Sequence, residues 1–135
     1  MIETFYRTSV KALIKNSEGK ILLSKEENGM WELLGGGLDH GETPQTGLVR
    51  EVQEETGLKV HSIGSQPSYY ITFPVTERGY YAANVIFEAQ IDSLNFTPSD
   101  ECIDLQYFSP KDILERTDMY NNVQMLAKLI LESQS

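Results

Sequence analysis

The feature that most constrains this chain is a glycine-rich loop followed by an acidic segment, at residues 35–58. This stretch reads GGGLDHGETPQTGLVREVQEETGL. Glu54 and Glu55 follow Glu51 by three and four positions, and at about 100° per residue all three project from one face of a helix. The sequence therefore predicts a helix that presents three carboxylates together.

An apolar stripe of Leu48, Val49 and Val52 lies directly beside these carboxylates on the same predicted helix. The helix can therefore pack against a core while it holds its acidic groups at the edge. Like charges four positions apart cost a helix roughly 0.2–0.5 kcal/mol per pair, and a divalent cation with oxygen ligands would remove this cost. The alternative interpretation is a solvated acidic helix, and the helix alone leaves both interpretations open.

The loop before the helix favours the cation, because loop and helix together resemble the box of the Nudix family over residues 36–58. The defined positions of the box are matched by Gly36, Glu42, Arg50, Glu51, Val52, Glu54, Glu55, Gly57 and Leu58. Two departures are mild: Leu34 stands where the family often has proline, and Gly47 stands where it often has alanine.

The resemblance implies an α/β fold, namely a Nudix-type α/β/α sandwich with a mixed β-sheet. It also implies a hydrolase that acts on phosphoric anhydrides and depends on a divalent metal. The expected reaction is attack of water at phosphorus in the pyrophosphate linkage of a nucleoside diphosphate derivative. The substrate is either a nucleoside triphosphate, ordinary or oxidised, or ADP-ribose or another nucleotide sugar.

The same resemblance assigns roles to residues of the box. Glu51, Glu54 and Glu55 are the expected carboxylate ligands of Mg²⁺ or Mn²⁺, and the carbonyl of Gly36 is a further candidate ligand. Arg50 flanks the acidic face, and we expect it to support the catalytic cluster by holding a carboxylate through a bidentate contact.

The general base has two candidates, since the family uses either a glutamate of the box or an acid from a later loop. Glu54 is the box candidate, and Glu101 resembles the later acid; Asp100 and Glu77 are poorer candidates. Glu42 has two open interpretations as well. It either supports the carboxylate cluster from the loop or stabilises the N-terminus of the helix electrostatically.

Aromatic residues are the candidates for contact with a nucleotide base. Tyr6 and Tyr80 are the predicted substrate-binding residues, although packing within a strand is the commoner role of such side chains. Trp31 precedes the glycines and is expected to be structural.

The whole chain of 135 residues suits one Nudix domain over residues 1–135. Its net charge of −9 and the lack of a basic run argue against nucleic-acid and membrane partners and favour a small nucleotide substrate. No signal-peptide pattern is recognisable, and the single cysteine, Cys102, fits a reducing cytoplasm and a place in the core. Family members often form homodimers, but no segment here identifies an interface.

Hydrophobic periodicity and turn residues predict the secondary structure. Strands are expected at 6–15 and 20–25, paired as a hairpin, and at 31–34, 60–73 with a break near 64–67, 80–91 and 103–108. Helices are expected at 44–56, 110–116 and 118–132. In the strand at 80–91, the face of Tyr81 is predicted to be core and the face of Tyr80 is predicted to border a cleft.

A second hypothesis is a Nudix-like sensor or scaffold that binds nucleotides without cleaving them. Such proteins usually lose residues of the box, whereas this chain retains them. The complete box therefore favours the enzyme.

Overall fold

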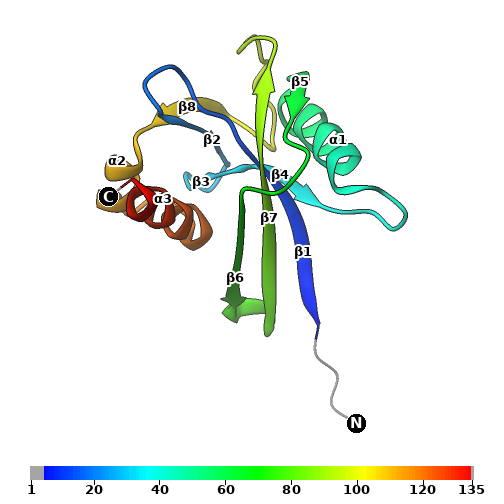
Figure 1. The fold of residues 1–135 in the computed structure, drawn as a ribbon, viewed down its shortest axis with the longest axis vertical. Helices are drawn as coiled ribbons and strands as arrows, with labels where there is room; N and C mark the ends of the chain where they lie inside the picture. Colours follow the sequence, from blue (N-terminus) through cyan, green and yellow to red (C-terminus); the bar gives the residue numbers. More distant parts are fainter. Residues whose placement is uncertain (1–4, 135) are drawn as a thin grey trace.

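The fold, seen in a computed structural model that describes residues 5–134, is an α/β sandwich (Figure 1). Its elements are β1 (Tyr6–Leu13), β2 (Ile21–Lys25), β3 (Trp31–Glu32), β4 (Leu34–Gly37), α1 (Pro44–Thr56), β5 (Val60–Ile63), β6 (Tyr69–Val75), the 3₁₀ turn η1 (Thr76–Arg78), β7 (Tyr80–Ile91), β8 (Asp104–Phe108), α2 (Pro110–Glu115) and α3 (Asn121–Ser133). The predicted elements are present, and α1 has the predicted bounds.

The larger sheet is mixed, as expected from the resemblance. Its strands run in the order β4–β1–β7–β5, and β6 also pairs with β7. The central pair, β1 and β7, is parallel, whereas β4, β5 and β6 pair antiparallel to their neighbours. A second, antiparallel sheet runs in the order β3–β2–β8.

The predicted hairpin between the first two strands is wrong. β1 belongs to the larger sheet and β2 to the smaller one. Beside the turn, an antiparallel bridge between Lys15 and Ile21 and bonds from the Leu22 amide to the Ile14 carbonyl and from the Asn16 amide to the Lys20 carbonyl join the two segments. β2 pairs instead with β8, from a distant part of the chain. Both strands are apolar enough to be buried in separate sheets, so their adjacency in sequence does not decide their pairing.

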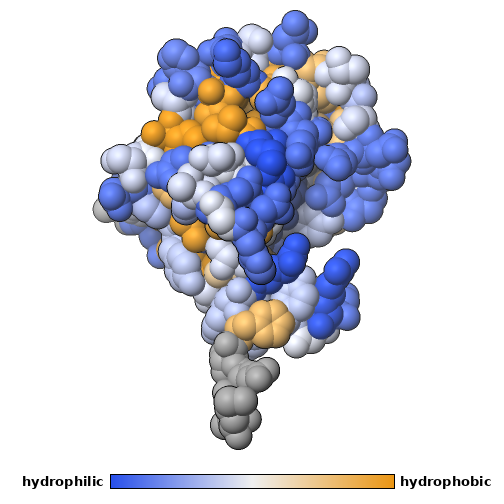
Figure 2. Space-filling model, turned by 90° about the vertical axis from the view of Figure 1, so that its right-hand side faces the viewer, coloured by the Kyte–Doolittle hydropathy of each residue, from blue (hydrophilic) through white to orange (hydrophobic). Residues whose placement is uncertain are grey.

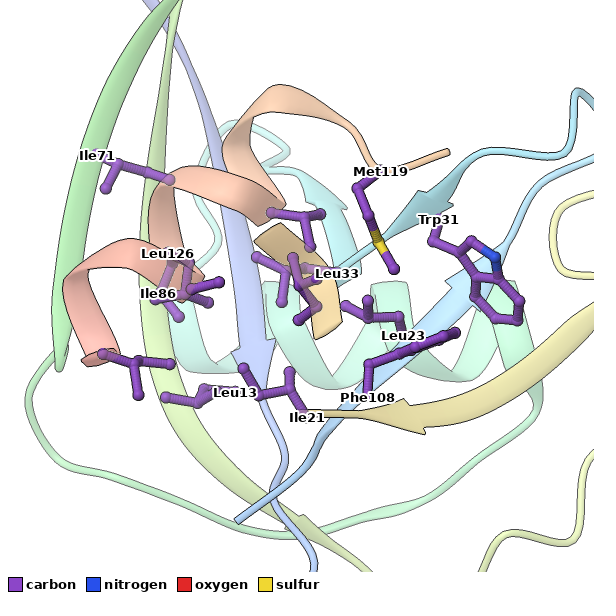
Figure 3. Packing of buried hydrophobic residues seen from close by; sticks show 14 residues of the cluster. Leu13, Ile21, Leu23, Trp31, Leu33, Ile71, Ile86, Phe108, Met119 and Leu126 are labelled. Atoms are coloured by element: carbon purple, nitrogen blue, oxygen red, sulfur yellow. The ribbon is translucent and has the colours of Figure 1, made fainter. Parts of the chain in front are cut away.

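Helices cover the larger sheet on both faces, which confirms the sandwich (Figure 1). On one face, Leu48 and Val52 of α1 pack with Val10, Ala12 and Phe87. On the other face, α3 packs against the sheet through a second cluster (Figure 3). That cluster includes Leu13, Ile86, Val123, Leu126 and Ile130.

The expectation that only one face of the strand at 80–91 is core was wrong. Ile86 is fully buried, and so is Phe87 on the opposite face. The cleft expected beside the second face is occupied by α3 along the middle of β7. In the described part of the chain, β7 borders cavities near its two ends, at Tyr80 and at Glu88, Ala89 and Gln90.

A polar link inside the second cluster fixes α3 on the sheet. The buried side-chain amide of Asn122 donates to Glu32 Oε1 at 2.7 Å and to Asn84 Oδ1 at 2.8 Å. Glu32 also accepts a bond from the Leu33 amide at 2.8 Å. Since unpaired buried polar groups are costly, this chain of bonds specifies how α3 sits against β3 and β7.

The side of the molecule that carries α1 is largely hydrophilic, with hydrophobic patches in its upper half (Figure 2). None of the helices in the described part of the chain combines the length and apolar character needed to cross a membrane. Cys102 is fully buried, as predicted.

The packing of α1 gives a prediction with a matched control. Leu48→Ala removes a fully buried side chain and should lower the free energy of unfolding by about 2–5 kcal/mol. Val49→Ala, at the next position of the same helix, removes a side chain that is 37% exposed and should change stability by less than about 0.5 kcal/mol. Urea denaturation curves would check this, and equal midpoints for the two variants would contradict the packing of α1 described above.

Candidate active site

Helix α1 is held in place by well-formed ends. Thr43 caps its N-terminus by accepting a bond from the Thr46 amide at 3.2 Å, and Pro44 takes the first helical position. At the other end, Gly57 adopts a left-handed φ of 74°, and its amide donates to the Gln53 carbonyl at 2.8 Å. These caps fix which residues of the helix face the sheet.

The glycines of β4 let the acidic helix approach the strand closely. A Cβ atom on Gly36 would lie 2.5 Å from Oε2 of Glu51, so a larger residue here would displace that carboxylate from its present position. At Gly35, with φ of +134°, a Cβ atom would lie 2.0 Å from the Val10 carbonyl oxygen of β1. The glycines therefore serve close packing of backbone and carboxylate.

Arg50 joins the glycine loop to the acidic face of α1. Its guanidinium binds Glu42 through two bonds, Nε to Oε2 at 2.6 Å and Nη2 to Oε1 at 2.8 Å. Nη1 donates to Glu51 Oε1 at 3.0 Å and to Glu54 Oε2 at 3.1 Å. The bidentate contact expected of Arg50 is thus present, and its partner is Glu42.

Glu42 supports the cluster from the loop, which answers the question left open by the sequence. Its Oε1 also accepts a bond from the Asp39 amide at 2.8 Å, so the carboxylate closes the loop on itself. The bonds from Arg50, first, and from the Asp39 amide lower the pKa of Glu42 from 4.5 to about 2. The same pairing raises the pKa of Arg50, so both groups stay charged at neutral pH.

Glu55 lies in a different environment from Glu54, its neighbour in the chain. The pKa of Glu55 is raised from 4.5 to about 8, mainly because burial disfavours the charged carboxylate. Attraction by the nearly buried Lys11 and a bond from Ser24 Oγ to Glu55 Oε1 at 3.0 Å act in the opposite direction. A desolvated carboxyl of this kind gains from a bound cation.

A cavity of about 480 Å³ brings Glu51 and Glu55 together with acids from two loops. Its walls are formed by Glu26, Glu27, Asn28, Glu51, Glu55, Asp100 and Glu101. Glu101 is held at this cavity because its loop is attached to α1 by Ser99, whose Oγ lies 3.5 Å from the Glu55 carbonyl oxygen. No lysine or arginine lines the cavity, so the negative charge of its carboxylates favours binding of cations.

Glu54 does not line this cavity. Its side chain is 58% exposed and is held by Arg50. It borders outer surfaces of α1 with Gln53. The three carboxylates predicted to act together are therefore divided by the structure, with Glu51 and Glu55 toward the cavity and Glu54 toward solvent.

The chemistry of this donor set fits a hard divalent cation, because carboxylate oxygens are the ligands that Mg²⁺ and Mn²⁺ prefer. Among residues 5–134, however, no three acids, histidines or cysteines stand close enough to form a complete set of ligands by themselves. Each of the three glutamates proposed as ligands on α1 has a protein partner instead, Arg50 for Glu51 and Glu54 and Ser24 for Glu55. Further ligands would have to come from a substrate's phosphates and from water.

The two tyrosines predicted to bind substrate lie on opposite faces of the sheet. Tyr6 packs against Tyr81, with ring centroids 5.7 Å apart, and lines neither the acidic cavity nor the cavity beside the loop. Tyr80 lies beside Phe5, with centroids 6.2 Å apart, and borders the cavity at residues 37–40. The structure therefore brings only Tyr80 near the glycine loop.

Sequence reasoning missed Ser24, Glu26 and Glu27 as residues of the site. Ser24 is a buried polar residue in an apolar strand, and the two glutamates follow that strand directly. The signal available in the sequence was the acidic pair at the end of the strand. Nothing in the sequence placed it beside α1, since the smaller sheet brings it there.

Comparisons with known proteins agree with this geometry. The sequence model of the NUDIX domain family matches residues 5–129. A MutT-like protein of Streptomyces ambofaciens is 30% identical over 92% of this chain and 77% of its own length. Nudix hydrolase 25 of Arabidopsis thaliana is 33% identical over 50% of this chain, and this match covers only 40% of that protein.

Among solved structures, the MutT protein from Methanosarcina mazei Go1 has the same fold. It superposes with a TM-score of 0.83 at 25% identity, and the match covers 100% of this chain and 99% of the other.

The pairing of Glu42 with Arg50 predicts a pH dependence of stability. Because the pKa of Glu42 is about 2 in the folded protein and ordinarily 4.5, its contribution is complete above pH 4.5 and is lost as the pH falls toward 2. Glu42→Gln should therefore be less stable than the natural protein at neutral pH, by a gap that narrows below pH 4.5. Urea midpoints measured across this range would check it.

The matched control is Glu18→Gln, which removes an exposed carboxylate whose partner Lys20 lies 3.8 Å away. Its effect on the midpoint should be small at every pH. A gap for Glu42→Gln that stays constant down to acid pH would show that the charge of Glu42 is not what stabilises the loop.

Proposed function

The chain belongs to the Nudix hydrolase family, and from this premise we propose that it hydrolyses the pyrophosphate linkage of a nucleoside diphosphate derivative. The substrate is a nucleoside triphosphate, ordinary or oxidised, or a nucleotide sugar such as ADP-ribose. The observation that carries the proposal is the acidic cavity, in which Glu51 and Glu55 of α1 meet Glu101 of a distant loop. We further propose that residues 1–135 act as one domain.

The cavity suits phosphoryl chemistry because that chemistry requires positioning and charge neutralisation more than covalent participation by the protein. Glu51 and Glu55 are the proposed carboxylate ligands of Mg²⁺ or Mn²⁺ inside the cavity, and Glu54 is a further proposed ligand from its outer edge. The carbonyl of Gly36 is proposed to contribute from β4. When bound, the cation would neutralise phosphate charge and lower the pKa of an attacking water.

Arg50 is proposed to position the carboxylates. It holds Glu51 and Glu54 on one side and the loop on the other, where Nη2 also donates to the Gly37 carbonyl at 3.2 Å. Carboxylates fixed in this way lose less conformational freedom on binding a cation, and so bind it more tightly.

Glu101 is the proposed general base. Glu101 lines the cavity together with Glu51 and Glu55, and Ser99 Oγ orients its backbone by accepting a bond from the Glu101 amide at 3.3 Å. Glu101 would accept a proton from the attacking water at its carboxylate oxygen. Glu54 is the alternative base, supported by its place in the box but removed from the cavity by its contact with Arg50.

The proposed ligands are tested by a substrate panel in Mg²⁺ and Mn²⁺, with phosphate and pyrophosphate release as the measurement. The natural protein should cleave at least one nucleotide of the classes named. Glu51→Gln and Glu55→Gln should each lower kcat by more than the roughly 10–100-fold typical of groups that only support a metal ligand. Glu18→Gln, far from α1 in sequence and exposed, is the control and should leave kcat unchanged.

Full activity of both variants would exclude the proposed metal site. Tight nucleotide binding without cleavage in any divalent cation would instead support a non-hydrolytic sensor.

The role of Glu101 is tested separately from metal binding. Glu101→Gln should lower kcat by roughly 10²–10⁴-fold, as expected for loss of a general base, and should remove the acid limb of the pH–rate profile. Its stabilisation by Mg²⁺ in a thermal melt should stay close to that of the natural protein. If Glu54→Gln removes that limb and Glu101→Gln does not, the base is Glu54.

A further inference from the structure

The loop between β2 and β3, at residues 26–30, forms part of the wall of the acidic cavity. Glu26, Glu27 and Asn28 line the cavity from this loop. The Glu26 amide donates to the Met30 carbonyl at 2.9 Å and closes the loop into a tight turn. This bond shapes the loop, but it does not fix where the loop lies relative to the rest of the cavity.

Three consecutive residues at the end of β2 attach this wall to other parts of the chain. The bonds run from Ser24 Oγ to Glu55 Oε1 at 3.0 Å, from the Ile103 amide to the Lys25 carbonyl at 2.8 Å, and from the Tyr120 hydroxyl to Glu26 Oε1 at 2.6 Å. They join the wall to α1, to the loop that carries Glu101 and to the residue before α3. The last bond is the shortest, as expected for a hydroxyl that donates to a carboxylate.

Tyr120 reaches the loop from a backbone that is itself held in place. It is the N-cap residue of α3, and its amide donates to the Trp31 carbonyl at 3.2 Å. The Trp31 amide donates to the Asp118 carbonyl at 2.8 Å, and Met119 pairs with Trp31 in a parallel bridge. Met119 and Trp31 are both buried in the cluster between α3 and the sheet (Figure 3). The Tyr120 side chain therefore extends from the core, and its hydroxyl is a fixed point against which the loop is placed.

The Tyr120 hydroxyl holds two residues of the loop at once. It donates to Glu26 and accepts a bond from the side-chain amide of Asn28 at 2.9 Å. Asn28 Oδ1 accepts a bond from the Met30 amide at 2.9 Å, so this side chain joins the turn to Tyr120. Within the described part of the chain, the second oxygen of Glu26, Oε2, has no such partner. A carboxylate with one oxygen held in this way is oriented in advance, and it loses less conformational freedom when its other oxygen binds a cation.

We propose that Tyr120 is a positioning residue of the active site, which holds Glu26 so that this carboxylate joins Glu51 and Glu55 in binding the divalent cation. Mg²⁺ and Mn²⁺ retain several waters, so the free oxygen of Glu26 binds the cation either directly or through one of these waters. The inference rests on the proposed function, because it takes the acidic cavity to be the cation site. It adds to that site a carboxylate from the loop after β2 and a support at the start of α3, both outside the box.

Tyr120→Phe removes the hydroxyl and keeps the ring. Each variant is titrated with Mn²⁺ alone, and the electron paramagnetic resonance signal of the free ion measures binding. Tyr120→Phe should bind Mn²⁺ about 10-fold more weakly than the natural protein, which is the lower end of the range for residues that orient a metal ligand. Tyr107→Phe is the matched control, because Tyr107 is half-buried in β8 and its hydroxyl makes no hydrogen bond within the described residues. This control should bind Mn²⁺ as the natural protein does.

A double-mutant cycle separates the positioning of Glu26 from a general effect on the fold. Glu26→Ala removes the acceptor of the Tyr120 bond, so adding Tyr120→Phe to it should cause no further loss of Mn²⁺ affinity. Glu27→Ala removes the next acid of the same loop, which has no bond to Tyr120, and in this background Tyr120→Phe should still cost about 10-fold. A loss of equal size in both backgrounds would show that Tyr120 only supports the fold, and it would overturn the inference.

The titration with Mn²⁺ does not depend on catalysis, so the two proposals fail separately. If the natural protein binds Mn²⁺ but cleaves no nucleotide, the proposed function fails, whereas weaker binding by Tyr120→Phe still supports the role of Tyr120. Equal Mn²⁺ affinity for Tyr120→Phe and the natural protein, or no binding by either, would overturn that role, whatever the activity. Urea midpoints establish that each variant is folded. If Tyr120→Phe is not folded, Glu26→Ala must bind Mn²⁺ more weakly than Glu27→Ala for the inference to stand.

Discussion

The ion-pair network of Arg50 is the interaction on which the site depends. A helix that carries glutamates three and four positions apart is repelled by its own charge, and the loop before it has no regular structure to hold it. The Arg50 guanidinium reduces the repulsion and anchors the loop. It binds Glu42 of the loop by two bonds, and Glu51 and Glu54 of the helix by one bond each. Loop and helix thus become one unit, and the carboxylates are oriented before any ligand arrives.

The same network leaves one carboxylate outside it. Glu55 turns toward the smaller sheet and is held by Ser24, where burial raises its pKa to about 8. The helix therefore presents two kinds of acid, an exposed one that is paired with Arg50 and a desolvated one that is bonded to Ser24. Differences in environment of this kind between neighbouring carboxyls are frequent at functional sites.

The two sheets and the glycines make this division possible. β2 pairs with β8 and not with its neighbour in the chain, β1. This pairing places Ser24 and the acids that follow it beside α1. The glycines of β4 let the strand pass close enough for Glu51 to lie against its backbone. The buried bonds of Asn122 to Glu32 and Asn84 hold α3 on the far face, so the sheet is fixed from both sides.

The sequence by itself determined the local structure and the identity of the acidic helix. Thr43, Pro44 and Gly57 set the bounds of α1, and the spacing of the box set which acids it carries, because caps and helical periodicity act between residues near in the chain. The family and the α/β sandwich followed from that motif. Only the tertiary structure decided that Glu54 turns to Arg50 and away from the cavity, that Glu26 and Glu27 join it, and that Tyr80 but not Tyr6 faces the loop. Those outcomes depend on the pairing of distant strands and on competition among partners for each carboxylate, and neither is encoded in local spacing.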